Sequence, residues 1–248
     1  MFIMFVPYGN NNISSAAIKS SFDTFISRYH QRLSELFAPS DTQSQLGLQR
    51  QFPSQFMKEV LDCRPLSVFI PEGFGGRGGD SAEALTMLEV SSYHSLPLSL
   101  MMGINGALFL QPVANYAEDT TKASIFDGVL RQNKMGGLMI TEPGFGSDAL
   151  RMQTRYRGEG SSYRIQGTKH WAGLTGEADY WLITARPENE QGELGRDVSF
   201  FVHPSENGGI EVEEVFNNLG LYMLPYGRNQ IDISVPECHK LEPKTIGI

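Results

Sequence analysis

Apolar side chains recur at helical spacing through the first half of the chain. One set repeats every three or four positions and predicts a long helix with one buried face: Phe22, Phe25, Ile26, Tyr29 and Leu33. A second set predicts a similar face further along: Leu85, Leu88 and Val90. The pattern through about residue 135 therefore indicates an all-helical region.

Several positions mark where these helices begin. Asp80, with an acidic residue three positions later, predicts a helix start whose negative charge suits the positive end of the helix dipole. Pro97 fits the first turn of the next helix, and Asp119 starts another that runs toward Leu130. We interpret the polar stretch 39–51 as a mobile loop between helices.

From Gly136 the apolar period changes to two, which is typical of strands with one buried face. Three such runs are separated by turn-rich stretches: 162–166, 180–184 and 198–202. The pattern predicts an α+β fold, with an all-helical domain over 1–135 followed by an antiparallel β-barrel or β-sandwich domain over 136–243. We interpret residues 244–248 as the truncated start of a further domain.

Composition narrows the possible partners. The 248-residue chain has 20 basic and 28 acidic residues and a formal net charge of −8, and no run of Lys or Arg is dense enough to follow a nucleic-acid backbone. Cys63 and Cys238 are too few for a disulfide framework or a zinc site, and the histidines show no ligand spacing. We therefore expect no nucleic acid, no metal and a reducing, cytoplasmic location.

We also expect no signal peptide and no membrane span. The opening segment 1–6 is apolar but carries no basic residue and is broken by Pro7. The Met-rich stretch 96–113 is interrupted by Pro97 and Gly103, short of the roughly 20 consecutive apolar residues that a span requires. This stretch is predicted to be a buried helix in a soluble protein.

One glycine-rich run invites a dinucleotide-binding interpretation. Residues 73–78 match G-x-G-x-x-G and follow the strand-like segment 66–70. The dinucleotide motif needs a following helix and a parallel strand, whereas the next segments here are helical again. The run is therefore predicted to be a tight turn between helices.

The most informative stretch is 139–148, where an apolar strand leads directly into a second glycine-rich turn. Gly144 and Gly146 allow backbone N–H groups to approach an anion without interference from a Cβ atom. Ser147 adds a hydroxyl donor, and Thr141 lies where the strand ends. This composition is typical of a turn that holds a phosphate.

The 139–148 stretch resembles the flavin-binding signature of the acyl-CoA dehydrogenase family, whose members commonly read T-E-P-G-x-G-S-D. Residues 70–76 resemble the family's early P-E-x-x-G-G turn, and 218–220 resemble its late K-L-G element, in the same order and spacing. Members continue into a C-terminal helical domain that carries the catalytic glutamate. The resemblance therefore implies the first two-thirds of such an enzyme, ending at Ile248 with the C-terminal domain absent.

The resemblance implies FAD as the cofactor and assigns candidate contacts. The backbone of Leu138 and Ile140 and the hydroxyl of Thr141 would face the flavin ring, Gly146 and Ser147 would contact the pyrophosphate, and Trp171 would lie against the isoalloxazine. Each has an ordinary structural alternative. Thr141 could bond its own turn, Gly146 and Ser147 could form a plain β-turn, and Trp171 could be a core aromatic residue.

The chain departs from the family pattern just after the tryptophan. Members usually read W-I-T-N or W-I-S-N, whereas this chain has glycine at position 173, so Gly173 offers the flavin only its backbone N–H. Ser147 and a wall formed by Met101 and Met102 are candidates for substrate binding, although the methionines could equally fill core space. The catalytic base stays unknown, because neither Glu72 nor Glu142 belongs to a catalytic motif.

Three functions stay open. The first is an FAD-dependent acyl-CoA dehydrogenase-like oxidoreductase that forms an α,β-double bond in an acyl-CoA thioester and passes electrons to an acceptor such as an electron-transfer flavoprotein. This isolated chain is expected to be inactive and to self-associate or form a homo-oligomer. The second is a noncatalytic, truncated module that acts by binding. The third is a flavin oxidase or monooxygenase on the same scaffold.

Overall fold

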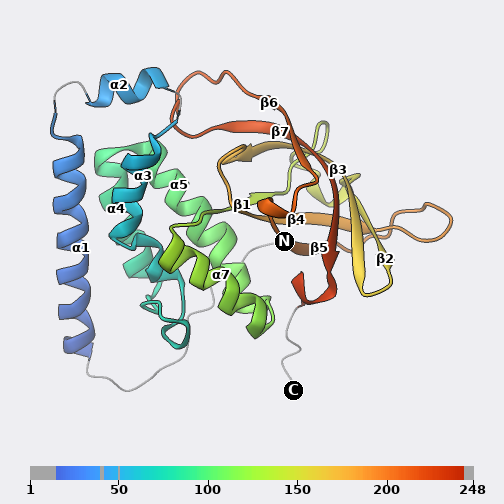
Figure 1. Cartoon of the computed structure of the whole chain (residues 1–248), viewed down its shortest axis with the longest axis horizontal. Helices are drawn as coiled ribbons and strands as arrows, with labels where there is room; N and C mark the ends of the chain where they lie inside the picture. Colours follow the sequence, from blue (N-terminus) through green and yellow to red (C-terminus); the bar gives the residue numbers. More distant parts are fainter. Residues whose placement is uncertain (1–14, 40–41, 50, 243–248) are drawn as a thin grey trace.

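The computed structural model describes residues 15–39, 42–49 and 51–242, so the opening segment 1–6 and the predicted unit 244–248 lie outside the described residues. Helices occupy one side of the molecule and strands the other (Figure 1). The helical elements are α1 (Ser15–Phe37), α2 (Thr42–Gln49), α3 (Ser54–Asp62), the 3₁₀ turns η1 (Pro65–Phe69) and η2 (Glu72–Phe74), α4 (Ser81–His94), α5 (Leu96–Gly103), the π-helical η3 (Ile104–Leu110), α6 (Gln111–Tyr116) and α7 (Asp119–Gln132).

The predicted helix starts are confirmed by the caps that the structure forms. The Asp80 carboxylate accepts a hydrogen bond of 2.9 Å from the backbone N–H of Glu83 at the start of α4. Pro97 lies in the first turn of α5, where the Ser95 hydroxyl accepts from the following turn, and α7 begins at Asp119. Local capping chemistry therefore places the starts of α4 and α5, whereas α7 begins without a side-chain cap.

The predicted apolar face agrees with the structure better in α1 than in α4. In α1, Phe22, Tyr29 and Leu33 are buried as expected. In α4 the prediction is wrong for Leu85, which is 64% exposed; Leu88 and Val90 are partly buried against the core, and the fully buried row is Ala84, Met87 and Ser91. That row follows strict three- and four-residue spacing. Its small members, Ala84 and Ser91, allow α1 to pack closely. The Tyr29 hydroxyl, 3.0 Å from the Ser91 hydroxyl, lies at this contact.

Two local predictions in the helical half are wrong. Segment 66–70 is not a strand: the η1 turn occupies most of it, since Pro65 begins a 3₁₀ turn after Arg64 takes a left-handed φ of 57°. The proposed mobile loop 39–51 contains α2, which Leu46 anchors in the core; residues 40–41 and 50 lie outside the described part. Burial of one apolar side chain outweighs the polar composition of that stretch.

The glycine run 73–78 forms a tight turn, as predicted, and not a dinucleotide site. Gly75 and Gly78 take positive φ of 85° and 60°, and the N–H of Gly78 donates to the Ile70 carbonyl at 2.9 Å. The turn connects η1 and η2 to α4 and adjoins no β-strand.

The second half forms one eight-stranded sheet in the order β6-β7-β3-β2-β4-β5-β8, with β1 paired beside β4. The strands are β1 (Gly136–Met139), β2 (Arg155–Glu159), β3 (Ser162–Gly173), β4 (Tyr180–Pro187), β5 (Ser199–Pro204), β6 (Ile210–Val215), β7 (Tyr226–Pro236) and β8 (Lys240–Leu241), and the short 3₁₀ turns are η4 (Ala149–Arg151), η5 (Ser205–Asn207) and η6 (Glu237–His239). The mostly antiparallel pairing is confirmed, but β4 pairs in parallel with both β1 and β2. The sheet does not close, so the barrel alternative is wrong and a sandwich-like arrangement is compatible with it.

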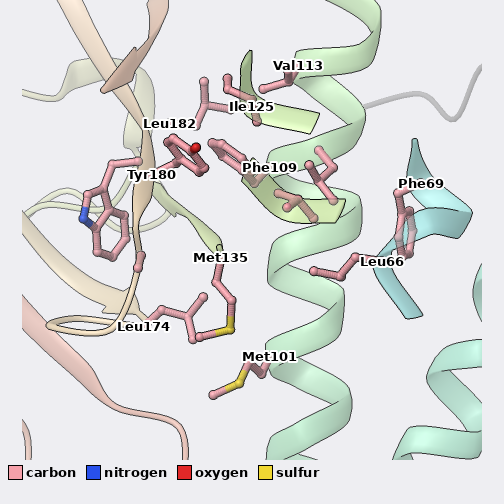
Figure 2. Packing of buried hydrophobic residues seen from close by; sticks show 14 of the residues in the cluster. Leu66, Phe69, Met101, Phe109, Val113, Ile125, Met135, Leu174, Tyr180 and Leu182 are labelled. Carbon is pink, nitrogen blue, oxygen red and sulfur yellow. The ribbon is translucent and has the colours of Figure 1, made fainter. Parts of the chain in front are cut away.

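The two halves share a core around the continuous helical run of α5, η3 and α6. In Figure 2 this helix lies between Leu66 and Phe69 of η1 on one side and Tyr180 and Leu182 of β4 on the other. The Phe109 and Tyr180 rings stack with centroids 6.0 Å apart. A Cβ atom at Gly136 would lie 2.0 Å from the Phe109 ring, so only glycine lets β1 pass this close to the helix.

The same helical run is long and apolar enough, by length and composition, to cross a membrane. It covers Leu96–Tyr116, and half of its most apolar window is buried inside the fold. Core helices of soluble proteins share this property, and here the run packs between η1 and the sheet (Figure 2).

Candidate functional site

The glycine-rich turn after β1 presents an open backbone surface. The N–H of Phe145 donates to the Glu142 carbonyl at 3.0 Å, and Gly144 completes the turn with a φ of 86°. Apart from their chain neighbours, no atom of the described residues lies within 4 Å of the Cβ positions of Gly144 or Gly146, and Ser147 is exposed. An anion can therefore approach the backbone and the Ser147 hydroxyl together.

Trp171 lies in a strained bulge of β3 beside this turn. Lys169 pairs with Asn229 of β7 and Ala172 pairs with Gly227, so three steps along β3 match two along β7 and one residue is extra. Within the bulge Trp171 takes a left-handed φ of 56° and is 54% exposed. The core-aromatic alternative for Trp171 is therefore wrong, and the bulge aims a large ring outward.

Phe216 and His170 complete an aromatic cluster around Trp171. The centroid of the Phe216 ring lies 4.8 Å from those of both Trp171 and His170, and the last two are 5.2 Å apart. Phe216 follows β6 and reaches the bulge because its backbone N–H donates to the Tyr226 carbonyl at 2.8 Å. Sequence reasoning missed Phe216, because this residue carries no motif of its own, although it lies two residues before the 218–220 element.

A hydrogen bond joins the turn to the bulge. The backbone N–H of His170 donates to the Thr141 carbonyl at 2.8 Å, which brings Thr141 and Trp171 to one face. Leu138 and Ile140 are partly buried immediately before Thr141. Five of the predicted contacts, from Leu138 to Ser147, thus lie on one stretch of chain that borders the tryptophan.

Gly173 is buried two residues beyond Trp171. A Cβ atom there would lie 2.7 Å from the Ile104 side chain and 3.3 Å from the Tyr226 ring. A threonine or serine at this position would therefore require both neighbours to shift. The hydroxyl that the family pattern places here is replaced by packing from η3 and β7.

Met101 and Met102 lie in the core. They are 2% and 0% exposed, and Figure 2 shows Met101 directed toward Met135 and Leu174. Neither methionine offers surface to a ligand in this conformation. The structure therefore does not combine the two buried methionines with Ser147, which is exposed in the glycine-rich turn after β1.

A buried ion pair lies beneath the turn. The Lys169 ammonium, with its side chain 0% exposed, is 3.0 Å from a Glu142 carboxylate oxygen. Burial lowers the pKa of Lys169 to about 8, although the Glu142 charge opposes that shift. Burial also raises the pKa of Glu142, but the Lys169 charge and the hydrogen bonds from Thr154 and Gln153 outweigh it and hold that pKa below its usual range.

The arrangement fits a flavin dinucleotide better than a metal. An open glycine turn with a hydroxyl donor suits a pyrophosphate, and a half-exposed aromatic cluster suits a flat ring. Among the described residues, no group of three His, Cys, Asp or Glu side chains is arranged to hold a metal ion.

Comparison with known proteins connects both halves of the chain with one family. Residues 30–133 match the acyl-CoA dehydrogenase N-terminal domain, and residues 137–233 match the acyl-CoA dehydrogenase middle domain. The mitochondrial short-chain specific acyl-CoA dehydrogenase of Rattus norvegicus is 27% identical over 178 residues, which are 72% of this chain and 43% of the relative. The benzylmalonyl-CoA dehydrogenase of Aromatoleum aromaticum is 27% identical over 196 residues, 77% of this chain and 50% of the relative.

The fold is shared with a solved butyryl-CoA dehydrogenase from Megasphaera elsdenii, with a TM-score of 0.79 at 18% identity, over 96% of this chain and 61% of that one. This chain spans about half the length of the curated relatives that it matches. Two domain models of one family match its helical and β halves in the order in which they occur. The chain therefore belongs to the acyl-CoA dehydrogenase family.

Proposed function

We propose that this chain contributes the helical and β-domains of an FAD-dependent oxidoreductase of the acyl-CoA dehydrogenase type, with the flavin held at the turn and bulge described above. One observation carries the proposal. Trp171 is held in a strained conformation and left half-exposed beside an open glycine turn. Strain at an exposed aromatic residue does not stabilise the fold and is typical of a ligand site.

The proposed contacts follow the geometry of the two elements. The backbones of Leu138, Ile140 and Gly173 and the hydroxyl of Thr141 border the ring, Trp171 stacks against it, and Gly146 and Ser147 hold the pyrophosphate. When bound, FAD supplies the hydride-accepting chemistry that no side chain provides. The chain's own groups bind and orient the cofactor.

The proposed substrate is an acyl-CoA thioester, which undergoes α,β-dehydrogenation, with an electron-transfer flavoprotein as acceptor. The names of the two curated relatives described above specify CoA substrates, which supports this class. Glu142 is not free to act as the base, because one carboxylate oxygen accepts from the Gln153 N–H and the other from Thr154 and Lys169. We therefore expect this chain alone to bind FAD weakly and to show no turnover of an acyl-CoA.

Self-association is also part of the proposal. Leu85, Leu96 and Leu100 are exposed on the packed helices α4 and α5. Association that covers these side chains would remove apolar surface from water, which supports self-association.

A flavin oxidase on the same scaffold is the second candidate. The observation that favours it is Gly173, which lacks the hydroxyl expected near the flavin and is enclosed by Ile104 and Tyr226. Air reoxidation of the reduced, FAD-loaded protein separates the candidates: rapid reoxidation favours the oxidase, and slow reoxidation favours the dehydrogenase.

Equilibrium dialysis with FAD and riboflavin tests the proposed site. Because Gly146 and Ser147 are proposed to hold the pyrophosphate, FAD should bind at least about tenfold more tightly than riboflavin, the equivalent of one good hydrogen-bonding contact. Ser147→Ala should narrow this difference, whereas Ser161→Ala, at the turn between β2 and β3, should leave it unchanged. Equal affinity for the two ligands, or binding of neither, would contradict the proposal.

A further inference from the structure

The Lys169 ammonium uses all of its hydrogen-bonding capacity at the base of the glycine-rich loop. It donates to the Ile140 carbonyl at 3.0 Å, to Glu142 at 3.0 Å and to the Thr184 hydroxyl at 3.1 Å. An ammonium group has three protons, so these three oxygen acceptors saturate it, and the Met152 sulfur at 3.4 Å is a weaker additional contact. The contacts come from the loop and from β4, and Lys169 itself lies on β3.

The backbone that enters the loop is fixed by donors from two strands. Thr184 donates to the Met139 carbonyl at 3.1 Å, Lys169 donates to the Ile140 carbonyl, and the His170 N–H donates to the Thr141 carbonyl. Three successive carbonyls therefore have partners in β3 or β4. Their orientation determines how the chain enters the turn.

The backbone that leaves the loop is held by Glu142. Its carboxylate accepts from the backbone N–H of Gln153 at 2.5 Å, from the backbone N–H of Thr154 at 2.8 Å and from the Thr154 hydroxyl. Lys169 thus holds the entry directly and the exit through Glu142. The open glycines and Ser147 lie between these two fixed ends.

Net stability does not account for a charged group at this place. Desolvation offsets most of the attraction in a buried ion pair, and apolar replacements often stabilise a fold equally well. What an apolar replacement cannot do is donate to the Ile140 carbonyl and the Glu142 carboxylate. The distinct contribution of Lys169 is therefore the conformation of the loop.

We propose that Lys169 is a positioning residue of the flavin site: it closes the base of loop 140–154 and so holds Gly144, Gly146 and Ser147 in the conformation that receives the pyrophosphate. The inference rests on the proposed function, because that function supplies FAD as the ligand. The effect on the loop itself does not require the ligand to be bound.

The test compares Lys169→Met with Lys122→Met. Lys122 is a matched control, because it is also buried and paired with one carboxylate, Asp119, but lies on α7. Amide hydrogen exchange of the full, FAD-free chain should be at least about tenfold faster in Lys169→Met at the hydrogen-bonded loop amides of Phe145, Gln153 and Thr154, with exchange in β7 unchanged. Lys122→Met should leave loop exchange as in the unsubstituted chain.

The second readout is the dissociation constant for FAD, measured by equilibrium dialysis. It should rise at least about tenfold in Lys169→Met and stay constant in Lys122→Met. Thr154→Val, which removes one donor to Glu142, should shift both readouts in the same direction by a smaller factor; it replaces Lys169→Met if that variant does not fold. Added salt should not restore FAD affinity in Lys169→Met or in Thr154→Val, because Lys169 and Thr154 are both buried.

Loop exchange equal to that of the unsubstituted chain, in a folded Lys169→Met or Thr154→Val protein, would overturn the positioning role. Faster loop exchange with unchanged FAD affinity would also overturn it. If the unsubstituted chain binds no FAD, the proposed function fails, and the exchange readout alone still decides whether Lys169 holds the loop.

Discussion

Trp171 is an aromatic residue at which backbone strain and solvent exposure coincide. A left-handed φ costs a residue with a Cβ atom about 1–2 kcal/mol. Its ring is 54% exposed, and its aromatic neighbours are His170 and Phe216, at the same bulge. The strain is therefore accounted for by what the ring presents to solvent rather than by core packing.

This strain can be measured by comparing Trp171→Gly with Trp171→Ala. Both variants lose the ring, but only alanine keeps a Cβ atom at a φ of 56°. We expect the glycine variant to be more stable by about 1 kcal/mol in urea denaturation, the reverse of the usual order. A more stable alanine variant would show that the bulge does not hold this residue in the left-handed region.

At the residue scale, sequence predicted the parts of the site that are continuous in the chain. Thr141, Gly146 and Ser147 belong to one motif, so they could be proposed from neighbouring residues, whereas the role of Leu138 was implied only by the family resemblance. Phe216 reaches the site through a hydrogen bond with β7, a strand whose pairing no local pattern specifies. The role of Lys169 depends on acceptors from two other elements, which only the fold brings together.

At the element scale, the π-helical segment η3 connects the helical half to the site. The Asn105 side chain donates to the Met101 carbonyl at 2.9 Å and accepts from the Gly136 N–H at 2.6 Å. The first contact satisfies a carbonyl of the irregular helix, and the second fixes the first residue of β1. Asn105 thereby links the register of β1 to the helix.

Asn105→Ala should therefore destabilise the protein by about 2–4 kcal/mol, because it leaves a buried carbonyl and a buried N–H without partners. Asn115→Ala, in α6 of the same helical run, is the control and should change stability by no more than about 0.5 kcal/mol. The free energies come from urea denaturation followed by circular dichroism. Equal effects in the two variants would rule out the link to β1.

Elements with strong local signals were predictable and others were not. The Asp80 cap and the first-turn residue Pro97 marked two helix starts, because both signals depend on neighbours in sequence. The α2 helix and the η1 turn were missed, since each depends on burial against distant elements. The strand β7 alternates between buried and exposed positions, but Gly227 and Asn229 occupy inward positions and hide that alternation in the sequence.

At the scale of the whole molecule, buried histidines make stability depend on pH. Burial lowers the pKa of His203 and of His239 below the ordinary value of 6.5. The unfolded chain therefore binds more protons than the folded protein just below that pH. Their contribution to stability is present above about pH 6.5 and is lost as the pH falls through the folded-state values.

We expect the free energy of unfolding to fall between pH 7 and pH 5, by up to about 1.4 kcal/mol per pH unit for each proton taken up. His203→Gln should reduce this slope. Glu142 does not contribute in this window, since its stabilisation is lost only as the pH falls below its ordinary value of 4.5. Urea denaturation at several pH values measures the slope, and a slope unchanged by His203→Gln would contradict the assignment.

Binding of FAD to the folded 248-residue chain is the central claim, and a titration followed by visible difference spectroscopy tests it most directly. We predict a saturable difference spectrum with one FAD bound per chain. Trp171→Ala should strongly lower the affinity for FAD. An unchanged flavin spectrum in the presence of folded protein at high concentration would contradict the claim. The turn and the bulge would then be a family fold without a working cofactor site.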